Sequence, residues 1–171
     1  MLSALGGCSQ IASPQVDSTS TSRDDSTDLN FAAGWEFQSE KAVLKHSVLS
    51  PDDTERMVSA SVLATESDAE RVRWDYLKEV SSDFASHFTD TSFEQGEFLV
   101  VVESLLPESH TIDDGKVSYD GERLSMDYEV VPSKRSGKAV TFSHSIEKWR
   151  APESKKPQNV AVKLCYSDSE R

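Results

Sequence analysis

Hydrophobic and polar residues alternate along most of the chain from about residue 29 onward, and this alternation predicts a mainly β domain. The most apolar stretch runs from Phe98 to Val102, between Gly96 and Pro107. Five consecutive apolar residues rich in Val predict a central strand that is covered on both faces.

Several other segments alternate with a period of two, as half-buried strands do. Residues 31–44 and 57–65 predict strands before the central one, separated by a turn cluster at 50–53. The pair Asp120-Gly121 predicts a tight hairpin turn between residues 116–119 and 122–131. Residues 139–150 and 159–166 bring the expected number of strands to about seven. The positions predicted to face inward are Val58, Ala60, Val62, Ala64, Leu124, Met126, Tyr128, Val130, Val140, Phe142, His144, Ile146, Val160, Val162, Leu164 and Tyr166.

One segment has helical spacing instead. Ser67-Asp68-Ala69-Glu70 matches a capping box, and the apolar residues after it share one helical face. The members of that face are Ala69, Val72, Tyr76, Leu77, Val80, Phe84 and Phe88. Trp74 lies off the face, so it is expected to be partly exposed or to mark a local break. Together the elements predict a two-sheet antiparallel β-sandwich with one helix, at about 68–88, packed on it.

The N-terminal part of the chain differs from the rest. Leu5-Gly6-Gly7-Cys8 has the form of a lipoprotein processing site, in which small residues precede the Cys that takes the lipid. Residues 9–28 are mostly Ser, Thr, Asp and Gln and predict a disordered tether. We therefore expect a processing site and tether at 1–28 and one sandwich domain at 29–171. Only four residues precede the predicted site, so the rest of a signal peptide would have to lie upstream; the alternative is a plain disordered tail with an incidental Cys8.

Charge narrows the range of partners. The formal net charge is −12, from 18 Lys and Arg against 30 Asp and Glu. This excess argues against nucleic-acid binding, which needs a basic face. Acidic residues spread over the whole chain favour a halophilic protein, because concentrated salt screens their repulsion. The alternative is an ordinary acidic protein. Every apolar run is far shorter than the roughly 18 residues that a membrane-spanning helix needs.

The tethered Cys8, the segment Arg73-Trp74-Asp75-Tyr76-Leu77, the run Phe98 to Val102 and the strand end Trp149-Arg150 together resemble uncharacterised surface lipoproteins of halophilic archaea. The resemblance covers most of the chain and implies an anchored surface domain, but no activity. The order of helix, apolar strand and hairpin is also similar to the PrcB-type domain, an accessory of a protease complex.

Motifs for catalysis and metal binding are absent from the sequence. The four His lie far apart and none has the HExxH spacing, and no nucleophile elbow, phosphate loop or dinucleotide-binding motif occurs. His144, on an inward position, is expected to be a hydrogen-bonded core residue. Cys165 is expected to be a small residue of the last strand, with a Cys8–Cys165 disulfide as the alternative. A copper site at Cys165 is rejected, because neither His nor Met follows it. We expect no catalytic residue, no metal and no cofactor.

Basic residues gather in one part of this acidic chain. Between Pro132 and Lys163 eight basic residues stand against two acidic ones. If the fold brings the loops 132–138 and 152–157 together, they form a patch that could dock an acidic surface protein or anionic lipid headgroups; the alternative is that these cations are solvated or locally paired. The residues of this candidate patch are Lys134, Arg135, Lys138, Trp149, Arg150, Lys155 and Lys156.

The expected function is that of a binding or envelope-organising module without catalytic activity. It would be held by lipid on Cys8 at the extracellular face of the cell membrane. Two alternatives stay open: an accessory subunit of a membrane or surface enzyme complex, and an unrecognised hydrolase or metal carrier.

Overall fold

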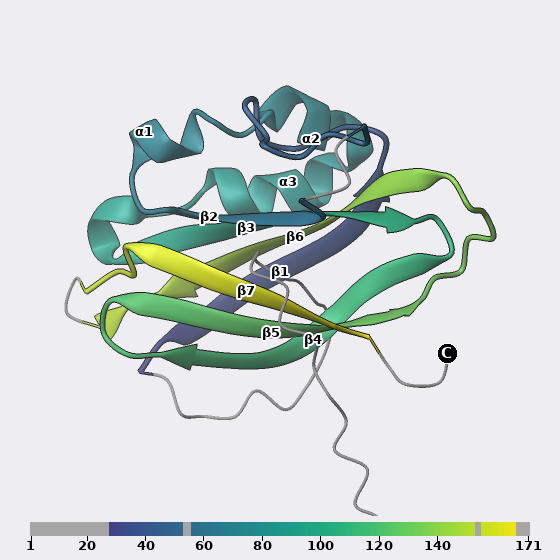
Figure 1. Cartoon of the computed structure of the whole chain (residues 1–171). Helices are drawn as coiled ribbons and strands as arrows, with labels where there is room; N and C mark the ends of the chain where they lie inside the picture. The colour runs from purple at the N-terminus through teal and green to yellow at the C-terminus, as the bar shows by residue number, and fades with distance from the viewer. Residues whose placement is uncertain (1–27, 53–55, 153–154, 167–171) are drawn as a thin grey trace, which may run out of the picture.

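The computed structural model describes residues 28–52, 56–152 and 155–166, which form three layers (Figure 1). Helices lie on one face of a four-stranded sheet, and a three-stranded sheet lies on its other face. The prediction of a mainly β, two-sheet sandwich of about seven strands is confirmed. The strands are β1 (Asn30–Ser39), β2 (Val58–Leu63), β3 (Glu97–Pro107), β4 (His110–Tyr119), β5 (Arg123–Pro132), β6 (Val140–Arg150) and β7 (Asn159–Tyr166).

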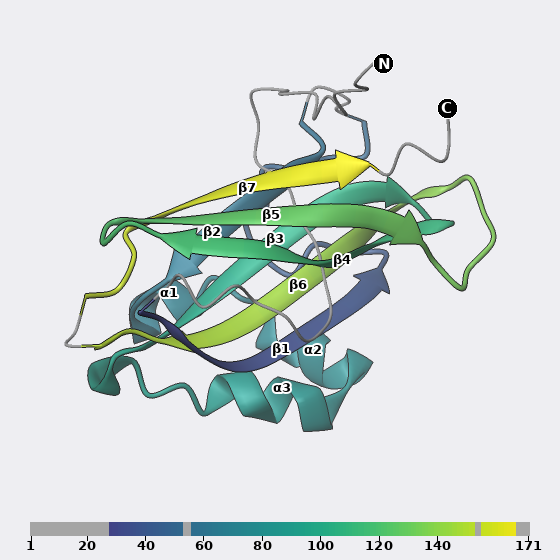
Figure 2. The ribbon, with the colours of Figure 1, turned by 90° about the horizontal axis from the view of Figure 1, so that it is seen from below.

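The strand orders are β1-β6-β3-β2 in one sheet and β4-β5-β7 in the other. The paired strands are antiparallel except β5 and β7, which run parallel from Arg123 opposite Asn159 to Val130 opposite Tyr166. Because β7 starts where β5 starts, the chain must first return along the whole of β6. This return fixes the positions of the loops on either side of β6 (Figures 1 and 2).

The apolar run lies in β3, an interior strand, and is buried on both faces as predicted. Phe98, Val100 and Val102 belong to the core between the sheets, whereas Leu99 and Val101 belong to the core under the helices. One strand therefore contributes to both cores.

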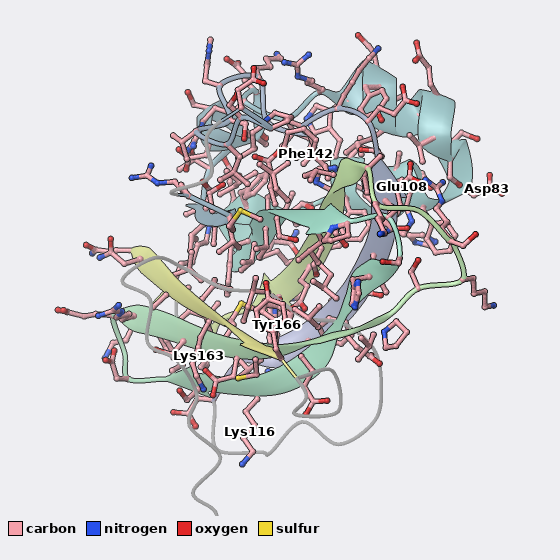
Figure 3. The ribbon with its side chains drawn as sticks, turned by 45° about the vertical axis from the view of Figure 1, so that its right-hand side comes forward. Asp83, Glu108, Lys116, Phe142, Lys163 and Tyr166 are labelled. Carbon is pink, nitrogen blue, oxygen red and sulfur yellow. The ribbon has the colours of Figure 1, made fainter. Side chains whose placement is uncertain are left out.

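The alternation predicted for the hairpin is confirmed, since Leu124, Met126, Tyr128 and Val130 of β5 are all buried between the sheets. Val162 and Leu164 of β7 are buried there too. Two positions predicted to face inward are instead exposed: Tyr166 by 63% and Val140 by 48%. Both lie at strand ends, where β7 finishes and β6 begins, and the neighbouring layers do not cover them. Figure 3 shows Tyr166 and Lys163 on the three-stranded sheet, with Phe142 on the side of the helices.

The predicted helix at 68–88 is divided into α1 (Glu66–Ala69), α2 (Trp74–Val80) and α3 (Ser82–Thr89). The capping box lies two residues earlier than expected, with Thr65 as N-cap and Asp68 as its reciprocal partner. The helix stops because Val72 forms a β-bridge with Leu44. It stops again at Ser81, whose backbone is extended. Trp74 starts α2 after the first break and is partly exposed, as its position off the helical face indicated.

Candidate functional site

The candidate basic patch is not assembled as one surface. Lys134, Arg135 and Lys138 lie in the loop between β5 and β6, whereas Lys155 and Lys156 lie in the loop between β6 and β7. These loops stand at opposite ends of β6 (Figures 1 and 2). The reason is that one loop precedes the 11-residue strand β6 and the other follows it. Docking by either group of residues stays a prediction.

Two further members of the patch are engaged within the fold. Trp149 is 2% exposed, packs edge-on against Phe31 and donates from Nε1 to Oε2 of Glu147 at 2.8 Å. It is a core residue and cannot belong to a surface patch. Arg150 is exposed and forms an ion pair with Glu97 at 2.9 Å.

Cys8 lies outside the described residues, as do all of residues 1–27, so lipid attachment and the alternative disulfide stay predictions. Cys165 is half-buried on β7, as expected for a small residue of the last strand.

His144 is fully buried on β6, and the prediction of a hydrogen-bonded core residue is confirmed. Its Nε2 lies 2.8 Å from Oγ of Ser39 and 3.1 Å from the carbonyl oxygen of Lys41. Since a carbonyl oxygen only accepts, Nε2 carries the proton and Nδ1 is the unprotonated nitrogen. Nδ1 has no hydrogen-bond partner among the described residues. Burial lowers the pKa of His144 to about 3, so the ring is neutral near pH 7.

Glu103 lies opposite His144 in the β3–β6 pairing and is fully buried. Its Oε1 accepts from the backbone N–H groups of Val43 and Leu44 at 2.7 and 3.0 Å, and its Oε2 accepts from Oγ of Ser47 at 2.5 Å. Burial raises the pKa of this carboxyl despite these donors. Glu103 and His144 thus hold segment 39–47 against the sheet, and both have a structural role.

Glu147 is a third titratable residue that is fully buried on the central strands. It accepts from the hydroxyl of Tyr128 at 3.0 Å and from Trp149, so it joins the two sheets through a polar contact inside the apolar core. Neither Glu103 nor Glu147 stands out in the sequence through a motif. The signal that the sequence offers for both residues is an acidic side chain within a segment predicted to be a buried strand.

A groove of about 550 Å³ carries charged side chains that solvent can reach. It lies between the end of β2, α1, the 3-10 helix η1 (Phe93–Gln95) and the loop before β7. Its apolar lining includes Val62, Phe93 and Pro157, and its charged lining consists of Asp68, Glu94 and Lys156. Three segments far apart in sequence form it, at residues 62–68, 93–96 and 156–158, and among these lining residues Lys156 alone is predicted from the sequence to bind a partner.

The side chain of Lys156 bridges two segments that line the groove. Its Nζ donates to the carbonyl oxygen of Ala64 at 2.7 Å and to that of Phe93, and lies 5.7 Å from the centroid of the Phe93 ring. Burial lowers the pKa of this ammonium group, and the nearby carboxylate of Asp68 opposes that change. The lysine therefore links β2 to η1 and presents a partly desolvated positive charge.

Asp68 is fixed by the start of α1. Its Oδ2 accepts from the N–H groups of Ala64 and Thr65, both at 3.1 Å, and from Oγ1 of Thr65 at 2.8 Å. Gly96 closes the groove behind η1 with φ +86°, a left-handed conformation that favours glycine. A Cβ at this position would lie 3.0 Å from the carbonyl oxygen of Ala151. The groove is thus built by backbone caps at both ends.

Comparison with models of protein families, with curated proteins and with solved structures finds no match to this chain. Within the described ranges, no group of three or more His, Cys, Asp or Glu could hold a metal ion. No helix in the same ranges is long and apolar enough to cross a membrane.

Proposed function

We propose that this protein is a lipid-anchored binding module of the cell surface, without catalytic activity, and that the groove around Lys156 is its binding site. The observation that carries the proposal is the combination of an apolar lining with both signs of charge in one open groove. Ligand sites typically measure roughly 300–1,000 Å³, are mostly apolar and carry a few fixed polar groups. The groove lies within this size range and combines fixed polar groups with some apolar side chains.

The anchoring part of the proposal rests on Leu5-Gly6-Gly7-Cys8 and on the polar composition of residues 9–28. The position of the groove is compatible with it. Asn30, near the start of the described chain, is opposite Arg150 of β6, which is opposite Glu97 of β3. Glu97 directly follows Gly96 of the groove. The segment from Cys8 therefore joins the domain at the end that carries the groove.

The decisive experiment is the intact mass of the native protein extracted from the membranes of its host. We expect a chain that begins at Cys8 and carries a lipid adduct, and a Cys8→Ser variant that is lost from the membrane fraction. A Cys165→Ser variant is the matched control and should stay membrane-bound. An unmodified wild-type chain in the soluble fraction would contradict the anchor.

A second candidate function, an accessory subunit of a surface enzyme complex, is favoured by two exposed apolar side chains on the helical layer. Phe84 of α3 is 48% exposed although it stacks on Trp35 of β1, with ring centroids 5.4 Å apart. Val80, near it in sequence, is 41% exposed. We expect Phe84→Ser to release a stoichiometric partner from the purified native complex; a chain that purifies alone would count against this function.

A further inference from the structure

Opposite charges line the groove without cancelling each other. Asp68 and Glu94 are acidic and Lys156 is basic. Asp68 acts on Lys156 through space, yet no ion pair within 4.0 Å joins these two described residues. The space between fixed charges of opposite sign is complementary to a ligand that itself carries both charges.

The hydrogen-bonding groups point to the same kind of ligand. An ammonium group has three donors, and Lys156 uses two of them on the carbonyl oxygens of Ala64 and Phe93. The third can meet a ligand carboxylate. Asp68 makes all three bonds of its cap through Oδ2, so its Oδ1 can accept from a ligand ammonium group. Glu94 is exposed and adds negative charge.

Ligands with one kind of charge fit less well. A phosphate or another simple anion would face two carboxylates for one ammonium group, and a simple cation would face the fixed charge of Lys156. The apolar lining from Val62, Phe93 and Pro157 offers contact to an aliphatic or aromatic side chain. A groove of about 550 Å³ has room for a dipeptide.

We infer that the groove binds a zwitterionic amino acid or short peptide, with the ligand carboxylate on Lys156 and the ligand ammonium group on Asp68 and Glu94. The inference rests on the proposed function, because it names the ligand of that site.

The test uses the full chain and three peptides: Leu-Leu, N-acetyl-Leu-Leu and Leu-Leu amide. Acetylation removes the ammonium group and amidation removes the carboxylate, so calorimetric titration separates the two charges. We expect Leu-Leu to bind and each blocked peptide to bind about tenfold more weakly, as the loss of one charged hydrogen bond implies. Equal binding of all three peptides, binding of N-acetyl-Leu-Leu as tight as that of Leu-Leu, or no binding at all would overturn the inference.

Substitutions in the groove test whether the peptide binds there. Glu94→Gln should weaken the binding of Leu-Leu and reduce the difference in affinity between Leu-Leu and N-acetyl-Leu-Leu. Glu122→Gln, the same change at an exposed residue of the β4–β5 turn, should leave binding unchanged. Lys156→Met should abolish the preference for Leu-Leu over its amide. Because Lys156 also bridges two segments, a Lys156→Met chain that fails to fold leaves Glu94→Gln as the deciding variant. Loss of peptide binding would not change the mass of the membrane-extracted chain, so failure of this inference and failure of the anchor are separately visible.

Discussion

Acid should destabilise this protein through His144, in a window that the structure defines. The ring is fully buried, and Phe37 and Phe142 lie 4.8 and 5.7 Å from it between ring centroids. A proton added at Nδ1 would find no acceptor among the described residues. The folded protein therefore keeps the ring neutral and holds its pKa at about 3, against an ordinary value of 6.5.

The sign follows from proton binding. Above pH 6.5 the ring is neutral in the folded and unfolded states, so stability does not depend on it. As the pH falls below 6.5 the unfolded chain binds a proton that the folded protein does not, and the free energy of unfolding decreases. The loss continues until the pH reaches the folded pKa of about 3. At about 1.4 kcal/mol per pH unit, the stability at pH 4.5 is lower than at pH 7 by about 2.5 kcal/mol.

The assay is urea unfolding of the wild type and of His144→Gln at pH 7, 5.5 and 4.5 in one salt concentration. Gln keeps a donor for the carbonyl oxygen of Lys41 but does not titrate. The difference between the two free energies of unfolding therefore isolates His144, and it should shrink by about 2.5 kcal/mol between pH 7 and 4.5. His87→Gln, at an exposed position, is the control and should follow the wild type. A difference that stays constant across this range would refute the reasoning.

Three other predictions concern the buried Glu103, the left-handed Gly96 and the net charge of the chain. Glu103→Ala should lower the free energy of unfolding by about 2–4 kcal/mol, because it strands buried donors of Val43 and Leu44, and hydrogen exchange should rise within segment 40–49 and not in β5. Gly96→Ala should lower the free energy of unfolding by about 1–2 kcal/mol, because its backbone is left-handed. The control is Gly121→Ala, which is also left-handed but has open space around it. Equal melting temperatures for the two variants would show that the close approach of residue 96 to Ala151 adds nothing. Raising KCl from 0.1 to 1 M should raise the midpoint of thermal unfolding, because the Debye length falls from about 10 to about 3 Å around a chain of net charge −12; a falling midpoint would contradict the halophilic hypothesis.

The sequence predicted the strands well wherever burial alternates locally. The inward residues of β5 follow from a period of two within ten residues, and both cores on β3 follow from five consecutive apolar residues. The division of the helix could not be predicted in this way. It depends on Val72 pairing with Leu44, and nothing in the spacing of 68–88 announces a partner 28 positions earlier. The apolar helical face continues from Val80 to Phe84 in the sequence, because helical spacing does not reveal that one residue, Ser81, has an extended backbone.

The basic patch failed as a single surface for a related reason. Counting charge along residues 132–163 adds up two loops that are close in sequence, but β6 separates them by its full length. The strand predicted at residues 139–150 already implies this separation, because the loop before a strand and the loop after it lie at its opposite ends. What the alternation does not encode is the parallel pairing of β7 with β5. The same topology then gives Lys156 a different setting. It brings the loop before β7 to the end of β2 and to η1, so that this residue meets Ala64 and Phe93.

The buried and accessible polar groups of this fold have separate tasks. Glu103, His144 and Glu147 all lie on the two central strands of the larger sheet, at positions with no exposed surface. The first two hold segment 39–47 on one face, and the third binds Tyr128 of the other sheet on the opposite face. Polar chemistry in the interior is thus used to fix the three layers to one another. Among the described residues, Asp68, Glu94 and Lys156 line an accessible groove at the rim of the sandwich, and this is why we place binding there and not among the buried carboxylates.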